Sequence, residues 1–213
     1  MKIGILGSAA VGQTLAKAFK AEGYDTMIGT RDVSKEALVT FSKANSIALG
    51  TFEDTAHFGE LLVICTKGSA AKLALNMAKV ENLASKIIID TTNPIAATAP
   101  ENGVLHFTTS LDHSLMEELQ QEFPNAKFVK AFNSVGNGAM YKPDYGGIKP
   151  SMFICGNDEA ARQSVATILD AFGWETEDMG TATAARAIEP LCMLWCIPGF
   201  LRNQWTHAFK LLK

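Results

Sequence analysis

The sequence predicts an α/β fold of the Rossmann type, in which a doubly wound parallel sheet is followed by C-terminal helices. The chain opens with an apolar strand, a glycine-containing turn and a helical pattern, which is the order of a dinucleotide-binding βαβ unit. Continuous apolar runs at 61–66 and 86–90 then alternate with helical patterns, as is typical of buried parallel strands joined by helices. We expect one NADP-binding domain over residues 1–213, with 182–213 as a C-terminal helical extension.

The N-terminal unit carries the strongest signal. A strand at 3–6 leads into the turn 7–12, which reads GSAAVG, and a helix and a second strand at 24–28 follow. Gly7 suits a tight turn, Gly12 lets the helix approach the strand, and the helix N-terminus offers free N–H groups to a pyrophosphate. Ala9 stands where the fingerprint G-x-G-x-x-G has its second glycine, so the match is imperfect. We therefore predict dinucleotide binding at Gly7, Ser8, Ala9, Ala10 and Val11, with an ordinary strand-to-helix turn as the alternative.

The end of the second strand indicates which dinucleotide is bound. An NAD site usually has a carboxylate there, whereas an NADP site has arginine or hydroxyl residues around the 2′-phosphate. This chain has Thr30 and Arg31, with Lys35 one turn further on. Arginine binds phosphate through two parallel N–H groups, so the pattern favours NADP. The alternatives are a solvated Arg31 and an Asp32 that bonds a ribose hydroxyl.

Composition and charge indicate which partners and which cell compartment to expect. The 213 residues are 47% hydrophobic and carry a net charge of −3, which gives no basic field for nucleic acid. The N-terminal apolar run is too short for a signal peptide, and we expect no membrane partner, because the most apolar stretch, 191–201, is short and contains Pro198. Four cysteines indicate reduced thiols in a cytoplasmic protein.

The rest of the chain continues the alternation of strands and helices. Helices are expected at 34–44, 52–58, 69–80 and 112–123, with a further one that is capped by Asn157 or Asp158 and runs to 172. Further strands of the parallel sheet are expected at 47–51, 61–66, 86–90, 128–132, 152–155 and 175–176. The tail 182–212 has a helical pattern with breaks at Pro190 and Pro198.

Several candidate cofactor-binding residues follow the carboxyl ends of predicted strands, where ligands bind in such sheets. They are Cys65, Thr66, Lys67, Asn93, Pro94 and Asn133. Thr66, Asn93 and Asn133 could hydrogen-bond the nicotinamide ribose and amide. Threonine and asparagine also cap turns, so a structural role is the alternative for each. Cys65 could touch the cofactor or simply be a buried thiol.

No acid–base, nucleophilic or metal constellation is recognisable, and no catalytic residue is assigned. The four histidines have no metal or triad spacing. Cys192 and Cys196 are one helical turn apart and could meet, but two thiols without further ligands indicate core residues. Arg186 and Glu189 have the spacing of an i, i+3 salt bridge.

The missing acid–base group is itself informative. Oxidation of an alcohol needs a proton acceptor, whereas hydride transfer between nicotinamide and a flavin-like ring mainly needs two rings held face to face. An apolar shelf for the second ring could come from Val135, Met140, Tyr141, Met193, Trp195 and Phe200. The alternative for these residues is the core or a dimer contact.

Several segments resemble the F420-dependent NADP oxidoreductase family: KIGILGSAAVGQTLAKAF, IGTR, VKAFNSVG, FICGNDEAARQSVATIL and AARAIEPL. They are also similar to the NADPH-binding reductase domain of the STEAP metalloreductases. The resemblance implies an NADP(H) site with the pyrophosphate at 8–11, the 2′-phosphate at Thr30, Arg31 and Lys35, and the nicotinamide end at Thr66, Lys67, Asn93 and Asn133. It also implies a stacked flavin or deazaflavin as second substrate, and a homodimer built with 182–201.

Three functions follow from these observations. The first is an NADPH-dependent oxidoreductase that passes hydride to a flavin or deazaflavin. The second is a non-catalytic NADP-binding redox sensor or partner module, which the missing acid–base group would also suit. The third is a small hydroxyacid dehydrogenase, which needs a large helical C-terminal domain that about thirty tail residues cannot supply.

Overall fold

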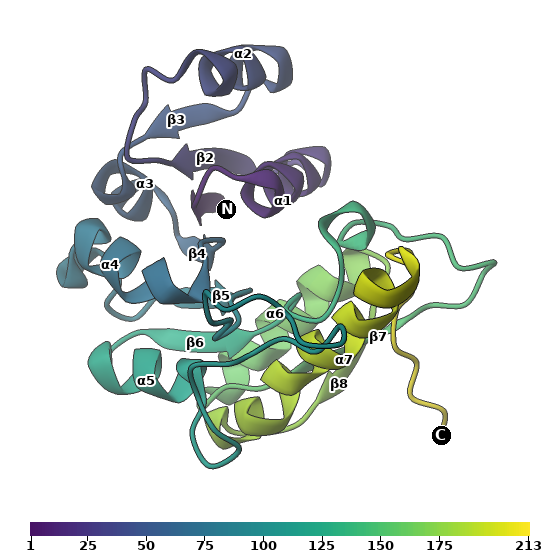
Figure 1. Cartoon of the computed structure of the whole chain (residues 1–213). Coiled ribbons are helices and arrows are strands. Elements are labelled where there is room, and N and C mark those ends of the chain that lie inside the picture. Colours follow the sequence, from purple (N-terminus) through teal and green to yellow (C-terminus); the bar gives the residue numbers. More distant parts are fainter.

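A six-stranded parallel sheet forms the centre of the molecule in the computed structural model, which describes residues 1–213 (Figure 1). The strand order is β3-β2-β1-β4-β5-β6. Strands β1 to β3 follow one another toward one edge and β4 to β6 toward the other, so the order of connection switches between β1 and β4. The strands are β1 (Lys2–Leu6), β2 (Asp25–Gly29), β3 (Ala48–Gly50), β4 (Leu61–Ile64), β5 (Ile87–Asp90) and β6 (Lys127–Lys130). The predicted Rossmann-type α/β class is confirmed, and the β1/β4 boundary is where such sheets bind ligands.

Helices cover both faces of the sheet. They are α1 (Ala10–Ala21), α2 (Glu36–Asn45), α3 (Phe52–Phe58), α4 (Gly68–Ala78), α5 (Leu115–Glu122), α6 (Glu159–Ala171) and α7 (Ala185–Arg202), with 3₁₀ turns at Val80–Asn82, Asn137–Ala139 and Ala182–Ala184. One core cluster lies between the sheet and α1 and α6, and a second lies between the sheet and α4 and α5. Each face therefore has its own apolar layer, as the continuous apolar strands require.

Side-chain caps fix where three of these helices begin. Thr51 and Asp54 form a capping box at α3, and Ser114 and Glu117 form one at α5. The latter explains why α5 begins at Leu115 and not at 112, since an N-cap residue has non-helical dihedrals. Of the two candidates for the cap of α6, Asp158 fills the position, accepting the Ala161 N–H at 2.8 Å.

The last two strands do not belong to the parallel sheet, so that expectation was wrong. β7 (Ser151–Ile154) and β8 (Glu175–Asp178) pair with each other in a separate two-stranded sheet. A single antiparallel bridge, Lys130 to Cys155, joins this unit to the edge of β6. The segment between β6 and β7 has no helix to carry the chain across the sheet, so the chain returns in the opposite direction.

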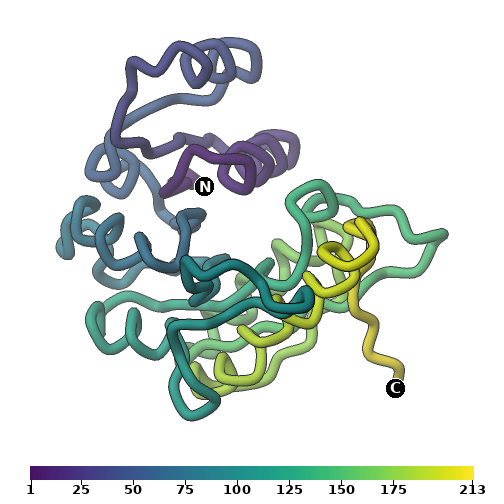
Figure 2. The backbone as a smooth tube through the Cα atoms, in the orientation of Figure 1, coloured from purple at the N-terminus to yellow at the C-terminus, as the bar shows by residue number.

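The C-terminal extension is one helix followed by an extended tail, not several helices broken at proline. Pro190 and Pro198 both lie inside α7, which ends where Asn203 adopts a left-handed conformation. Packing of one side of α7 on the domain outweighs the two lost backbone hydrogen bonds. Residues 203–213 leave the helix and run back past β7 (Figure 2), where the Ser151 N–H donates to the Phe209 carbonyl at 2.9 Å.

The unbroken helix also changes the expectation that no segment is long enough to cross a bilayer. Residues 182–202 form a 21-residue helical stretch that contains an 18-residue window with a mean hydropathy of 1.3, so one segment meets the length and composition of a membrane span. Core helices of globular proteins meet the same test. Glu189, near the middle of this stretch, is buried and bonded to the domain interior, which is the environment of a core helix.

A buried ion network holds α7 to the sheet. The Lys130 amine, fully buried at the end of β6, lies 2.7 Å from Asp90 Oδ2 and 2.9 Å from Glu189 Oε1. Burial alone would lower the pKa of Lys130, but the attraction of Asp90 and Glu189 outweighs it and raises that pKa, so the amine is charged. Glu189 also accepts the N–H groups of Leu115 and Met116 at 3.0 Å each. One carboxylate thus joins α7 to both β6 and the start of α5.

The pairing expected between Arg186 and Glu189 does not occur. Arg186 instead binds Glu117 at the start of α5, with a closest distance of 2.7 Å, while Glu189 turns inward to Lys130. The i, i+3 spacing permits a pair on an exposed helix surface. In α7 each side chain finds a better-placed partner on a neighbouring element.

We expect Lys130→Met to destabilise the fold by about 3–5 kcal/mol, because it leaves two buried carboxylates without their cation. The measurement is chemical unfolding followed by circular dichroism. Lys72→Met is the matched control, since it removes the exposed pair with Glu122 at 2.9 Å, for which we expect a loss of at most about 1 kcal/mol. Equal losses for the two variants would contradict the assigned role of Lys130.

Candidate functional site

The turn after β1 brings two segments of backbone too close for side chains. Gly7 has a φ of +133°, and a Cβ there would lie 2.6 Å from the Cys65 carbonyl oxygen. A Cβ on Gly12 would lie 2.0 Å from the Gly7 carbonyl oxygen. Both positions require glycine, as the sequence predicted. Gln13 Nε2 donates to the Ser8 carbonyl at 2.9 Å and fixes the turn from the helix side.

The N-terminus of α1 is open to an anion. Its N-cap residue, Ala9, provides no side-chain cap, and the first turn contains no acidic residue. Ala9 and Ala10 are exposed and Val11 is half-buried, so the backbone N–H groups at the start of the helix face the groove above the sheet. Free N–H groups and the positive end of the helix dipole together suit a pyrophosphate.

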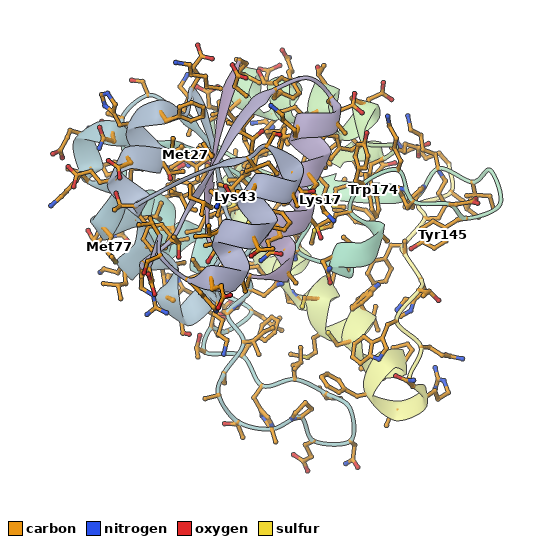
Figure 3. All side chains as sticks on the ribbon, turned by 90° about the horizontal axis from the view of Figure 1, so that it is seen from above. Lys17, Met27, Lys43, Met77, Tyr145 and Trp174 are labelled. Carbon is orange, nitrogen blue, oxygen red and sulfur yellow. The ribbon has the colours of Figure 1, made fainter.

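A first cavity of about 380 Å³ extends from this turn across the end of β2. Gly7, Ser8 and Ala9 form one end of it, and Thr30, Arg31 and Lys35 line the other. The opposite wall is apolar and comes from Phe52 and α4: Ala70, Leu73, Ala74 and Met77. Leu73 and Met77 are 59% and 38% exposed, and together they give this wall an apolar surface that a ligand could cover. Figure 3 shows Met77 on the side of the molecule away from Tyr145 and its projecting loop.

Asp32 lines the same cavity but is engaged elsewhere. Its Oδ1 accepts the Ser34 N–H at 2.9 Å and the Ser34 hydroxyl at 2.6 Å. These bonds to Ser34 lower the pKa of the Asp32 carboxyl below its ordinary value. Thr30 stays near Ser8, with 3.3 Å between their hydroxyl oxygens. The arrangement leaves Arg31 and Lys35 available to a ligand at the end of β2, which suits a 2′-phosphate better than a ribose hydroxyl.

A second cavity of about 560 Å³ continues along the same sheet edge. It shares Cys65, Thr66 and Lys67 with the first, so the two form one groove across the carboxyl ends of β1, β4 and β5. Its walls are hydroxyl and amide residues, Ser69, Thr91, Thr92, Asn93 and Thr108, together with the small apolar group Val11, Ile95, Ala96 and Ala97. Neither a carboxylate nor a histidine lines it.

Thr66 stands at the junction of the two cavities. Its hydroxyl oxygen is buried and has no hydrogen-bond partner within the protein. A buried polar atom of this kind costs free energy unless something else satisfies it. The Thr66 hydroxyl is therefore placed to bond a ligand that spans the junction.

The two predicted asparagines form one unit, of which only Asn93 lines the cavity. Asn93 Nδ2 donates to the Asn133 carbonyl at 2.8 Å, and Asn133 Nδ2 donates to Asn93 Oδ1 at 3.1 Å and to the Ile188 carbonyl at 2.9 Å. Asn133 is buried and lines neither cavity, so it orients Asn93 and ties it to α7. Pro94 is also buried outside both cavities.

Cys65 lines the groove without being a reactive thiolate. Burial raises the pKa of its thiol to about 12, so it is protonated at neutral pH. Of the other thiols, Cys192 is buried and Cys196 half-buried on α7. No group of three metal-ligating side chains occurs in the chain.

The apolar shelf expected from six aromatic and aliphatic residues is not where the sequence suggested. Val135, Met140 and Trp195 are buried, Tyr141 donates to Glu22, and none of the six lines either cavity. The groove uses α4 and the segment 95–97 instead. The apolar positions 70, 73, 74 and 77 on one side of α4 were the available sequence signal. An ordinary amphipathic helix would show the same spacing.

The residues present fit NADP(H). The glycine cradle and open helix end suit the pyrophosphate, Arg31 and Lys35 suit a 2′-phosphate, and the unpartnered Thr66 hydroxyl lies between the two cavities. A dinucleotide needs an elongated site with polar groups at both ends, and the joined cavities provide one.

Known proteins agree with this assignment. Residues 2–94 match the family model described as NADP oxidoreductase, coenzyme F420-dependent. The crystal structure of an Arthrobacter sp. FB24 protein, described as a candidate F420-dependent NADP-reductase, is 32% identical, has a TM-score of 0.92, and is matched over 100% of both chains. A hypothetical Sinorhizobium meliloti protein, SMa0349, is 20% identical with a TM-score of 0.73, over 100% of this chain and 96% of that one, and shows the same fold.

A longer protein is similar to this chain over most of the chain's length. Metalloreductase STEAP3 of Rattus norvegicus is 30% identical over 207 residues, which are 94% of this chain and 39% of that protein. The chain thus corresponds to less than half of that relative. Its full-length similarity to the Arthrobacter protein, together with the family match over the N-terminal unit, makes this chain a member of the F420-dependent NADP oxidoreductase family.

Proposed function

We propose that the protein transfers a hydride between NADPH and a flavin or deazaflavin ring. The observation that carries this proposal is the second cavity, which adjoins the NADP-type site, contains neither a carboxylate nor a histidine, and has the exposed Lys67 as its one basic side chain. Ring-to-ring hydride transfer needs two rings held in contact and no protein proton acceptor, whereas alcohol oxidation does need one. The family match and the Arthrobacter structure support the same chemistry.

In this scheme the role of the chain's own residues would be to bind and orient the cofactor. Arg31 and Lys35 would hold the 2′-phosphate, the start of α1 the pyrophosphate, and Thr66 and Asn93 the nicotinamide end. When bound, NADP(H) supplies the hydride chemistry. Val11, Ile95 and Ala96 would exclude water from the face on which the second ring lies.

The groove beyond the second cavity supports an acceptor with a polar side chain. A third cavity of about 560 Å³ shares Gly68, Ser69 and Thr108 with the second and is lined largely by polar residues. They include Lys72 and His113, which are paired with Glu122 and Glu118 in the same wall. Flavins and deazaflavins combine a planar ring with a long polar chain. An apolar-walled cavity that is followed by a polar one matches that shape.

The direct test is NADPH oxidation, followed by absorbance, with FMN, FAD, a deazaflavin or a ferric chelate as acceptor. We expect turnover with at least one of the ring acceptors and little with the ferric chelate alone. Tight NADPH binding without turnover on any of the four would instead favour the non-catalytic NADP-binding sensor.

Arg31→Ala should weaken NADPH binding about tenfold to a hundredfold, because it removes a charge-assisted contact to phosphate, while NADH binding stays within about twofold. Titration of both nucleotides measures this. Lys43→Ala is the control for a general loss of positive charge, since exposed Lys43 lines neither main cavity. A parallel loss of NADPH and NADH affinity in the Arg31 variant would contradict the NADP assignment.

We also propose that the protein is a homodimer whose contact includes the outer side of α7. Leu194, Phe200 and Leu201 are 55%, 47% and 54% exposed there, a concentration of apolar surface typical of a contact. Light scattering after gel filtration should give twice the chain mass of 22.9 kDa. Leu194→Glu with Leu201→Glu should shift it to the monomer mass. A monomeric wild-type protein would rule out the dimer.

A further inference from the structure

The buried network of Lys130, Asp90 and Glu189 lies directly behind the wall of the second cavity. Lys130 Nζ donates to the Thr92 carbonyl at 2.8 Å. From the other side, Asp90 Oδ1 accepts the Thr92 N–H at 2.8 Å and the Thr92 hydroxyl at 2.7 Å. Thr92 lines the second cavity, so the network and the cavity are separated by a single residue.

The network carries an unbalanced charge. One ammonium group faces two carboxylates, which leaves a net charge of minus one, and all three side chains are almost completely excluded from solvent. The two N–H groups at the start of α5 offset part of this charge at Glu189. Solvent screens the remainder less than it screens a surface charge, because water does not contact the three groups. Lys67, the one basic residue on the cavity wall, is exposed at the rim.

On the proposed function, the nicotinamide end of the cofactor lies in this second cavity. The nicotinamide ring is neutral in NADPH and carries a positive charge in NADP⁺. We propose that Asp90 and Glu189 act through Lys130 and Thr92 as positioning residues that make the site electrostatically selective for NADP⁺ over NADPH. A cofactor bound next to this charge gives up its hydride more readily than a cofactor in water.

A merely structural role predicts something different. If the network only held α7 and α5 in place, its loss would weaken both forms of the cofactor alike. If its charge acts on the ring, its loss changes the ratio of the two dissociation constants, and by linkage that ratio fixes the reduction potential of the bound couple relative to the free one.

Glu189→Gln removes the extra negative charge and keeps the size of the side chain. We expect NADP⁺ binding to weaken about tenfold more than NADPH binding, the order of magnitude for one unit charge acting through a protein interior. Fluorescence or calorimetric titration with each form measures the two constants on protein whose folding is checked by circular dichroism. Asp90→Asn makes the same charge change from the sheet side and should shift the ratio in the same direction.

Glu117→Gln is the matched control. It also weakens the contact between α5 and α7, because Glu117 is the partner of Arg186, but this pair is partly exposed and lies outside the groove. It should leave the ratio unchanged. An unchanged ratio in folded Glu189→Gln or Asp90→Asn would overturn the inference while leaving the proposed function intact.

If wild-type protein binds neither form, the proposed function fails as well. If neither variant folds, the wild-type protein decides: binding of NADP⁺ at least as tight as that of NADPH supports the inference, and tighter binding of NADPH contradicts it.

Discussion

The contact on which the structure depends most is the ion network around Lys130. Four elements meet there: the ends of β5 and β6, the start of α5, and the middle of α7. Desolvating three charged groups is expensive, and the attraction between them only offsets that cost when every group is well bonded. Here Asp90 Oδ1 accepts the N–H and hydroxyl groups of Thr92, and Glu189 accepts two backbone N–H groups, while Asp90 Oδ2 has its ion pair with Lys130 alone. The apolar layers alone would not fix α7 in one position, because this helix is apolar on nearly all sides.

The same geometry that stabilises α7 shapes the groove. The strand ends of β5 and β6 place Asp90 and Lys130 opposite each other in register, and the chain that leaves β5 at once becomes the wall of the second cavity. Asn133, which leaves β6, bonds both Asn93 and the Ile188 carbonyl of α7. The wall therefore belongs to a rigid unit of sheet and helix, and not to a free loop. The proposed hydride transfer would benefit from this, since small displacements slow such transfers strongly.

The parts predictable from the sequence are those with local causes. Gly7 has a positive φ in the turn after β1, Gly12 contacts the Gly7 carbonyl within the same turn, and Arg31 directly follows its strand, so all three could be recognised from spacing. The Cys65 carbonyl, which a Cβ on Gly7 would also meet, lies far along the chain and could not. Asp158, the N-cap of α6, was one of two adjacent candidates, because a cap residue is also recognised from its position just before a helical pattern. The long-range pairs could not be found this way. Arg186 and Glu189 each bond a residue far along the chain, and α7 continues through Pro190 because tertiary packing, which no local pattern encodes, outweighs the lost hydrogen bond.

The apolar wall of the first cavity shows why site residues and core residues are hard to separate in a sequence. Leu73 and Met77 follow the spacing of a core-facing helix, yet they remain exposed because α4 turns that side toward the groove. On the opposite side of the groove, Asp32 keeps its carboxylate bonded to Ser34 while Arg31 and Lys35 remain available. An apolar face for a base and a cationic end for a phosphate thus lie across one cavity. It is their juxtaposition across the strand ends, and not any one residue, that supports an NADP site.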